Sequence, residues 1–274
     1  RFSGPWLMEM TAAGKAEPFV PLPADLLRQE EGGAFVRLAP LKEGLPGWAG
    51  KEMLPLWRRS RSPAKRETGY LSWTGMKKYL KGEVPGPEDA KKLDELYAID
   101  RRTGIGVDPQ SLAAEEGLIY SVGLLVLKPK INFYAEVEGD AAWVKGKLDQ
   151  SPVLSFGGEG RRVLVKTIPA AVWPAPPPAG ERRAILLTAP AWFPQGWRPE
   201  GIEIVSAAVP GYQAVSGWDL ARNGPKPTRF TAAAGSVYYL EEPYHLPHPG
   251  SLCAEAEDAA CGWGTFLEGR FNYV

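Results

Sequence analysis

The chain has 274 residues, of which 44% are hydrophobic and 23% are charged, a composition that excludes a disordered protein. Its 32 lysines and arginines are balanced by 32 aspartates and glutamates, so any site for nucleic acid has to be a local basic patch. No apolar run approaches membrane-spanning length and Cys253 and Cys261 are too few for a disulfide framework, so we expect a cytoplasmic protein of one large or two ordinary domains.

The N-terminal residues are predicted to form short strands joined by turns. Phe2 to Met10 and Phe19 to Leu22 have a strand pattern around a turn at Ala13–Gly14, and Phe35 to Leu38 is a further candidate. The sequence begins at Arg1, inside a strand-like phrase, and we expect that residues preceding this strand are missing from it. The 27 prolines and 31 glycines are spread without a period, which predicts many turns and few long helices.

The most basic segment extends from Lys51 to Lys81, where nine lysines and arginines face only two glutamates. Tryptophans and tyrosines are interleaved with these cations. Single-stranded nucleic-acid sites have this composition, because cations hold phosphates and ring faces stack on bases. The same pattern also fits a loop followed by a short helix at Thr74 to Leu80 whose basic face is solvated.

The central part of the chain is predicted to change from helix to strand. Pro87 to Tyr97 has the start signals and apolar face of a helix, and Asp100 to Glu116 is polar and rich in turns. Gly117 to Leu127 and Ile131 to Val137 alternate well enough to predict a β-hairpin that turns at Lys128–Lys130.

A glycine turn follows between Val153 and Thr167. Gly157, Gly158 and Gly160 let the backbone adopt positive φ and approach a ligand closely. This turn is not a phosphate-binding P-loop, because the terminal Gly-Lys-Ser/Thr of that motif is absent.

A proline-rich segment then marks the expected domain boundary. Three consecutive prolines favour a stiff spacer, so we expect domains at residues 1–168 and 184–274 joined by a linker at residues 169–183. In the second domain Ala184 to Thr188, Ile202 to Val209 and Ser236 to Leu240 are predicted strands.

The stretch from Ser216 to Glu241 is the best candidate for an anion site. It begins with a basic loop that contains Arg222, Lys226 and Arg229, and prolines at 225 and 227 stiffen this loop before the strand begins. Arginine suits phosphate geometry, and proline lowers the entropy lost when a loop is held still. A solvated surface loop with ordinary charges is the alternative.

Few residues have the pattern of catalytic or metal-binding chemistry. His245 and His248 could be combined with Cys253 and Cys261 into a zinc site, but the spacing matches no familiar finger and prolines interrupt it. Asp108, Glu115 and Glu116 are neighbouring carboxylates of the kind that cap turns or stay solvated. No Gly-x-Ser-x-Gly elbow, metal helix motif or kinase motif set occurs. We therefore expect no enzyme, no metal and no cofactor.

Several phrases together resemble one family. The sequence is similar to the third-subunit family of the Cmr complex, the type III-B CRISPR effector, which belongs to the RAMP superfamily of RNA-binding proteins. The phrases are RRTGIGVDPQSLAAEEGLIYSV (Arg101 to Val122), LSFGGEGRR (Leu154 to Arg162), SGWDLARNGPKPTRFTAAAGSVYYLE (Ser216 to Glu241) and GWGTFLEGRF (Gly262 to Phe271).

The resemblance implies an α+β protein of two ferredoxin-like (RRM-like) domains, each an antiparallel sheet with helices, the first lacking its N-terminal strand and helix. It implies a non-catalytic subunit that binds the 5′ repeat tag of the guide RNA. Its protein partners would be the large polymerase-cyclase subunit and the backbone RAMP subunit, and no membrane would be involved.

The residues that we expect in the RNA groove lie beside glycine or proline turns. They are Arg102, Gly157, Gly158, Gly160, Arg161, Arg222, Lys226, Thr228, Arg229, Gly262 and Gly264. Two alternatives remain open. One is an RNA-processing endonuclease that uses His245 or His248 as general base, and the other is a scaffold that touches only proteins.

Overall fold

Antiparallel strands dominate the fold and helices are few and short. The computed structural model describes residues 1–43, 45, 47–48, 52–60, 62–158, 160–219, 221–241 and 245–274. Lys51 and Arg61 of the predicted basic segment therefore lie outside the described residues. Among the described residues no helix is long and apolar enough to cross a membrane.

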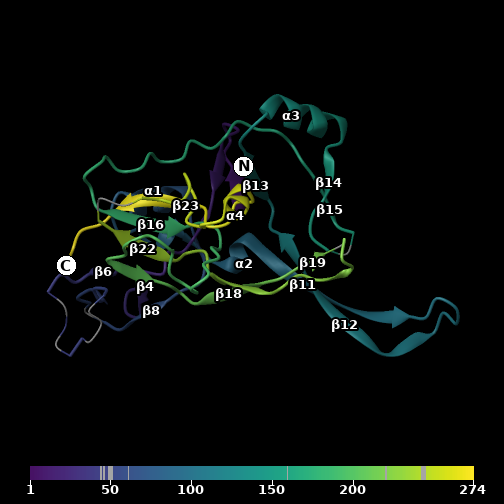
Figure 1. Cartoon of the computed structure of the whole chain (residues 1–274), viewed down its shortest axis with the longest axis horizontal. Helices are drawn as coiled ribbons and strands as arrows, with labels where there is room; N and C mark the ends of the chain where they lie inside the picture. Colours follow the sequence, from purple (N-terminus) through teal and green to yellow (C-terminus); the bar gives the residue numbers. More distant parts are fainter. Residues whose placement is uncertain are drawn as a thin grey trace.

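The two largest hydrophobic cores lie on either side of a four-stranded antiparallel sheet in the order β17-β22-β16-β23, in the left half of Figure 1. Its strands are β16 (Arg183–Leu187), β17 (Ser206–Ala208), β22 (Val237–Leu240) and β23 (Phe266–Arg270). All residues of β16 and β22 are buried, because alternate side chains enter separate cores on the two faces of the sheet. The strands expected at Ala184 to Thr188 and at Ser236 to Leu240 are confirmed as β16 and β22. The strand expected at Ile202 to Val209 is shorter, since β17 covers only Ser206–Ala208.

One face of this sheet is covered by the N-terminal part of the chain. Helix α1 (Trp73–Leu80) lies against β23 so closely that a Cβ on Gly269 would be 2.8 Å from the Cα of Leu80. Ser72 begins the helix, since its side chain accepts a hydrogen bond from the backbone N–H of Gly75. The helix expected at Thr74 to Leu80 is thus confirmed.

The opposite face is covered by the connection between β16 and β17 and by the segment before β23. Phe193, Ile202 and Leu252 fill this second core. The residues from 188 to 205, between β16 and β17, contain no helix. Between β22 and β23, α4 (Ala256–Ala260) is the only helix among the described residues 241 and 245–265.

Smaller sheets make up the N-terminal part. They are β13-β1-β2, β10-β9-β3, β5-β4-β8 and β6-β7. Their strands are β1 (Phe2–Met10), β2 (Ala16–Pro18), β3 (Val20–Pro21), β4 (Leu26–Gln29), β5 (Phe35–Arg37), β6 (Ala39–Pro40), β7 (Leu56–Trp57), β8 (Ala64–Arg66), β9 (Tyr70–Leu71), β10 (Ala90–Lys91) and β13 (Ile131–Val137).

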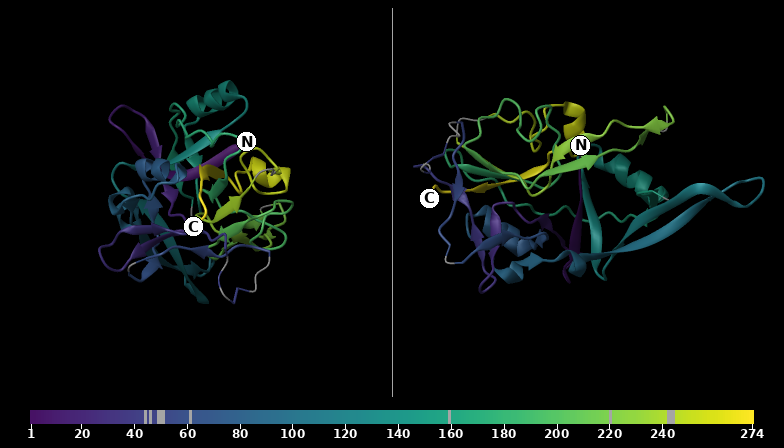
Figure 2. Two further views of the ribbon diagram at one scale, coloured as in Figure 1. Left: turned by 90° about the vertical axis from the view of Figure 1, so that its left-hand side faces the viewer. Right: turned by 90° about the horizontal axis from the view of Figure 1, so that it is seen from below.

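Three two-stranded ribbons and one exposed helix project from the same end of the molecule (Figure 1, and Figure 2, right). The ribbons are β11 (Tyr97–Val107) with β12 (Ala114–Leu127), β14 (Val153–Ser155) with β15 (Arg162–Leu164), and β18 (Tyr212–Val215) with β21 (Arg229–Ala232), the last extended by β19 (Trp218–Asp219) and β20 (Gly224–Pro225). The helix is α3 (Ala141–Gln150), which has no buried residue.

The predicted helix from Pro87 to Tyr97 is wrong. The segment forms a 3₁₀ turn, η1 (Pro87–Asp89), then β10, then the single-turn helix α2 (Leu93–Leu96), and Tyr97 already begins β11. The backbone of β10 pairs with β9, Ala90 opposite Leu71, so tertiary pairing overrides the local helical pattern.

The predicted hairpin of Gly117 to Leu127 with Ile131 to Val137 is also wrong, although both segments are strands. Strand β12 pairs with β11, and β13 pairs with β1 along a register that includes Trp6 opposite Tyr134. The turn at Lys128–Lys130 exists, but the strands on either side of it separate to different partners because buried rings stabilise the β1–β13 pair.

The main hydrophobic core contains residues from both sides of the expected domain boundary. Leu26, Leu71 and Tyr79 pack in it together with Leu186 and Tyr239. Residues 169 to 182 form no helix or strand, and β16 begins at Arg183. The division into domains stays a prediction, and the shared core shows that the two parts contact each other through buried side chains.

A buried polar network joins these two parts. The Asp25 carboxylate is fully buried and accepts hydrogen bonds from the Arg37 guanidinium at 2.9 Å and from the Tyr79 and Tyr239 hydroxyls at 2.8 and 2.7 Å. The Arg37 side chain also stacks on the Tyr79 ring, 3.9 Å from its centroid. Because these residues come from a loop, β5, α1 and β22, the network links elements far apart in sequence.

Candidate nucleic-acid interface

The ribbon of β18–β21 and β19–β20 carries most of the basic loop predicted from the sequence. At its outer turn the Asp219 carboxylate accepts hydrogen bonds from the backbone N–H groups of Ala221 and Arg222. Asn223 adopts φ of 48°, a conformation that asparagine tolerates in tight turns. The backbone N–H of Lys226 donates to the Gly217 carbonyl at 2.8 Å and pins the strands together. These hydrogen bonds show that the loop forms an ordered β-hairpin rather than an irregular segment.

Two cations project from this ribbon into solvent. Arg222 is exposed and its guanidinium lies 3.9 Å from the Asp219 carboxylate, which is at the limit of an ion pair. Lys226 and Thr228 are exposed as well. Pro225 and Pro227 flank Lys226 and restrict its backbone, which lowers the entropy lost on binding an anion.

The ribbon also exposes aromatic rings that sequence reasoning missed. Tyr212, Trp218 and Phe230 are 75%, 56% and 58% exposed. The rings of Tyr212 and Phe230 lie 5.4 Å apart on the same face, edge to face. The aromatic residues on both sides of the basic loop could have indicated an aromatic surface. The strand pattern alone, however, does not show which face of the strand is exposed. Cations and exposed rings are thus combined on one ribbon.

Arg229 points to the opposite side of the ribbon from Phe230. Its guanidinium makes two contacts with the Asp258 carboxylate, at 2.7 and 2.9 Å, and stacks over the Trp192 ring at 4.7 Å. These contacts satisfy the positive charge within the protein and anchor the ribbon to α4. Arg229 is therefore not among the cations that the structure leaves free for an anion.

The glycine turn between β14 and β15 is exposed, as the sequence led us to expect. Gly157 and Gly160 have φ of 83° and 63°, and a Cβ at Gly157, Gly158 or Gly160 would touch nothing. Arg161 is exposed and its carbonyl closes the turn by accepting the Phe156 N–H. This turn projects from the same end as the basic ribbon (Figure 1).

Arg102 lies elsewhere, on β11. Its guanidinium is paired with the carboxylate of Asp100, Nε to Oδ2 at 2.9 Å, on an exposed part of the long ribbon. An exposed pair of this kind contributes little to stability.

Gly262 and Gly264 are buried among the protein's own atoms. A Cβ at Gly262 would lie 2.8 Å from the Phe2 carbonyl oxygen, and one at Gly264 would lie 2.9 Å from the Cys253 Sγ. Both glycines have positive φ, 89° and 65°. They admit the chain's own backbone at close range, so the structure does not place them on an accessible groove, in contrast to the expectation from the sequence.

The predicted basic segment is split between core and surface. The aromatic rings of Trp73 and Tyr79 are buried in the core, so they are not stacking platforms. The hydrogen bond to Asp89, at 2.7 Å, raises the pKa of Lys78. Arg66 donates to the Pro210 carbonyl at 3.1 Å and thereby lies beside the start of β18, and burial lowers its pKa.

The histidines show no catalytic arrangement among the described residues. His248 hydrogen-bonds through Nε2 to the Ala254 carbonyl, and His245 is exposed. No group of three or more histidine, cysteine, aspartate or glutamate side chains in the described part of the chain could hold a metal ion.

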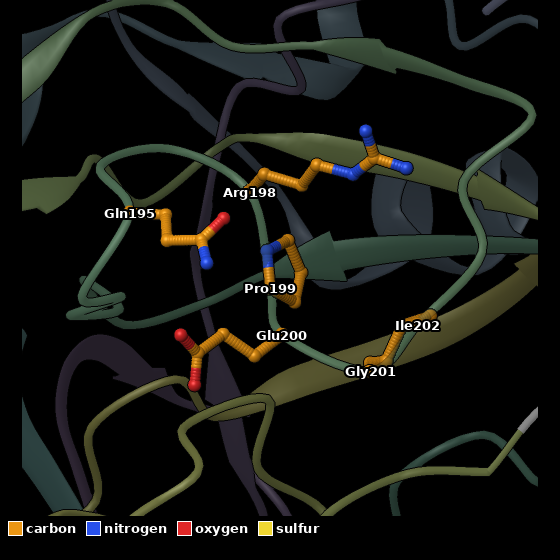
Figure 3. Close-up of a pocket in the computed structure, with 6 residues that line it drawn as sticks. All are labelled: Gln195, Arg198, Pro199, Glu200, Gly201 and Ile202. Carbon is orange, nitrogen blue, oxygen red and sulfur yellow. The ribbon is translucent and has the colours of Figure 1, made fainter. Parts of the chain in front are cut away.

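A pocket of about 340 Å³ lies within the connection between β16 and β17 (Figure 3). One loop supplies its whole lining: Gln195, Arg198, Pro199, Glu200, Gly201 and Ile202. In Figure 3 the side chains of Arg198 and Glu200 extend in opposite directions, and Arg198 pairs with Glu52 at 3.4 Å. The polar groups do not converge, which is unlike a specific ligand site.

Comparison with known proteins identifies similarities over most of the chain. A family model described as "CRISPR-associated protein (Cas_Cmr3)" matches residues 1–270. A chain of the "Cryo-EM structure of the Type III-B Cmr-beta bound to cognate target RNA and AMPPnP, state 1" is similar with a TM-score of 0.45 and 16% identity, over 81% of this chain and 66% of that one.

A chain of the "Cryo-EM structure of the Type III-B Cmr-beta bound to cognate target RNA" matches with a TM-score of 0.42 and 16% identity, over 81% of this chain and 65% of that one. The chain thus spans 66% and 65% of the length of these two solved chains. The comparison with curated proteins finds no match.

Proposed function

Because the chain belongs to the Cas_Cmr3 family of CRISPR-associated proteins, we propose that it is a non-catalytic RNA-binding subunit of a type III-B CRISPR effector complex. It binds the 5′ repeat tag of the guide RNA and docks the large polymerase-cyclase subunit onto the backbone RAMP subunit. The observation that carries the RNA-binding part is the ribbon of β18–β21 with its extension by β19 and β20. It presents Arg222 and Lys226 together with the exposed rings of Tyr212, Trp218 and Phe230.

The chemistry of this ribbon suits single-stranded RNA. Unstacked bases of a tag bind by stacking on aromatic faces, and their phosphates bind exposed cations. The turn between β14 and β15 extends from the same end of the molecule, and its Gly157, Gly158 and Gly160 have no side chain that would keep an RNA backbone at a distance. A local basic patch on a chain of zero net charge leaves neutral and acidic surfaces for protein neighbours.

We further propose that residues 184–274 form a ferredoxin-like domain with reduced helices. The order β17-β22-β16-β23, with every neighbour antiparallel, supports this, since it places the first and third strands of the unit at the centre of the sheet. The first crossover, from β16 to β17, contains no helix, and in the described part of the second, from β22 to β23, α4 is the one helix.

The proposal is tested by measuring RNA binding of the whole chain, with and without the large subunit. The probes are a guide RNA with its 5′ tag and the same RNA with the tag scrambled, each at two salt concentrations. Tag-dependent binding without cleavage is the expected result. Equal affinity for both RNAs would contradict tag recognition, and cleavage that depends on His245 and His248 would show an endonuclease instead.

Reversing the charge of Lys226 or of Arg222 is expected to weaken RNA binding in a salt-dependent way. The slope of log affinity against log salt is negative, and each lost phosphate contact reduces its magnitude by about 0.7 on single-stranded RNA. Fluorescence anisotropy between 50 and 200 mM salt, chosen as a range over which such contacts change affinity strongly, measures this slope. The matched control is Lys15→Glu in the turn between β1 and β2. Equal slopes for Lys226→Glu and Lys15→Glu would remove Lys226 from the site.

The exposed rings are expected to contribute through stacking rather than charge. Phe230→Leu keeps an apolar side chain but removes the ring face, so RNA affinity should fall by roughly 5-fold to 150-fold, the equivalent of one lost base stack. Phe230→Tyr keeps the ring face and should bind nearly as the unaltered chain does. The same titrations measure both variants, and a comparable loss in Phe230→Tyr would argue against stacking.

A further inference from the structure

A second group of cations lies at the base of the basic ribbon, at the end opposite its outer turn. It belongs to residues 54–66, a segment whose two ends are both tied to the chain that leads into β18. At one end the Leu54 N–H donates to the Val205 carbonyl at 2.8 Å, and at the other end the Arg66 guanidinium donates to the Pro210 carbonyl at 3.1 Å. The whole segment therefore lies against the entry to the ribbon.

Within this segment the two basic parts are brought to one edge of β4. The Gln29 side-chain amide donates to the Ser60 hydroxyl at 2.8 Å, and Ala64 pairs opposite the same glutamine on β8. Arg59 directly precedes Ser60, and Lys65 directly follows Ala64. Cations from before and after the turn of this segment thus lie next to each other.

Three of these cations keep their charge free for an anion. Arg58 and Arg59 are exposed, and among the described side chains no carboxylate pairs with either of them. Arg66 is exposed as well, and the partner that holds it is a neutral carbonyl. We call Arg58, Arg59, Lys65 and Arg66 the base cluster.

The carboxylates beside the base cluster do not neutralise it. Glu67 is paired with Arg28 and is thereby satisfied within the protein. Glu30 lies 3.8 Å from Lys65, and because both side chains are more than half exposed this pair is weak. Glu31 is exposed in the same turn. Four cations against these two glutamates leave the base cluster positive.

Exposed rings connect the base cluster to the outer turn of the ribbon. In register along the ribbon, Tyr212 comes first, then Phe230 opposite position 214, and then Trp218 opposite position 225. Gly211 separates Tyr212 from the carbonyl that holds Arg66, and a Cβ on this glycine would touch nothing, so the path is open. In Figure 1 the order from left to right is β8, β18 and β19. The strand residues from β18 to β19 extend over at most about 24 Å.

This order of charges and rings fits a single strand of RNA. Phosphates bind exposed cations, and unpaired bases stack on exposed rings, so a strand that lies along the ribbon meets cations at both ends and rings between them. An acidic protein surface would complement the cations but would offer no bases to the three rings.

We propose that one RNA strand runs along the ribbon from Arg222 and Lys226 at the outer turn, over the three rings, to the base cluster, where Arg58, Arg59 and Arg66 hold its phosphates. The proposal rests on the proposed RNA function and extends it to a second, separate set of phosphate contacts. Because phosphate contacts carry no sequence information, the base cluster should hold any RNA that reaches it, whatever its tag.

Charge reversal of the base cluster tests the proposal. Arg58→Glu and Arg59→Glu, each made singly, should reduce the magnitude of the slope of log affinity against log salt by about 0.7, on the tagged and on the scrambled RNA alike. Lys15→Glu is the matched control, because Lys15 is exposed in the turn between β1 and β2. All three variants should melt at the temperature of the unaltered chain, since none of these side chains is buried.

Stepwise shortening of the RNA separates direct contact from an indirect effect. On the shortest RNAs whose binding still depends on Lys226, Arg59→Glu should bind as Lys15→Glu does, because such a strand does not reach the base cluster. An effect of Arg59→Glu that is the same at every RNA length would contradict a contact at the far end of the strand.

The outcomes distinguish this proposal from the proposed function. Slopes of both arginine variants equal to that of Lys15→Glu overturn the base cluster and leave the ribbon site intact. Loss of affinity in the arginine variants but not in Lys226→Glu overturns the ribbon site and with it the continuous track. An unchanged RNA slope together with weaker binding of the large or backbone subunit would make the base cluster a protein contact instead.

Discussion

Asp25→Asn is expected to lower the free energy of unfolding by about 3–5 kcal/mol, because it leaves the buried Arg37 guanidinium without its counter-charge. The Asp25 carboxylate has no exposed surface and binds Arg37, Tyr79 and Tyr239 at 2.7 to 2.9 Å. Although burial opposes the charge of Arg37, the neighbouring Tyr79 and Asp25 hold its pKa above the ordinary value. Chemical denaturation followed by fluorescence measures the loss.

The two tyrosines of this network stay protonated donors over the whole neutral range. Burial, above all, raises the pKa of both Tyr79 and Tyr239 well above the usual value. The matched control for the substitution is Asp149→Asn on α3, where the Lys145–Asp149 pair at 2.6 Å is exposed and should contribute less than about 1 kcal/mol. Similar small losses for both variants would show that the buried network does not hold the two parts of the chain together.

Gly264→Ala is expected to destabilise the fold by about 2–5 kcal/mol. Of this, about 1–2 kcal/mol comes from placing a side chain at positive φ, and about 1–3 kcal/mol from overpacking. The new Cβ would lie 2.9 Å from the Cys253 Sγ and 3.0 Å from the Cys253 backbone nitrogen, and backbone does not move aside easily. Denaturation curves measure the change, and RNA titrations of the folded variant should give unchanged affinity.

Gly160→Ala isolates the packing part of this effect. Its φ of 63° is nearly that of Gly264, at 65°, but a Cβ there would touch nothing. Only the backbone cost of about 1–2 kcal/mol should therefore remain. If Gly264→Ala instead lost RNA affinity while keeping its stability, Gly264 would line an RNA groove as the sequence suggested.

The elements predicted best were those whose pattern is local. The strand of Ser236 to Leu240 and the helix of Thr74 to Leu80 form close to their predicted positions, because buried runs and a serine cap are properties of neighbouring residues. The phrases from Arg101 to Phe271 likewise sufficed to suggest the family that the match over residues 1–270 confirms.

The candidate site was predicted only in part. Arg222 and Lys226 are exposed on a proline-flanked hairpin, as the composition of that loop indicated. Arg229 is an arginine of the same predicted loop as Arg222, yet its side chain contacts Asp258 and Trp192 on the other side of the ribbon. The rings of Tyr212 and Phe230 were missed because alternation shows that a strand has two faces without showing which of them is covered.

Composition, local pattern and the family phrases were therefore readable in the amino-acid order alone: an antiparallel, turn-rich protein with a local basic loop. The partner of each strand was not, since β12 pairs with β11 and β13 with β1 through contacts that depend on packing between distant segments. The amino-acid order also does not show what surrounds a given glycine. Gly160 and Gly264 share a backbone conformation, and folding places one in open space and the other against Cys253. Local sequence limits the conformation of each residue, whereas long-range packing decides what that residue touches.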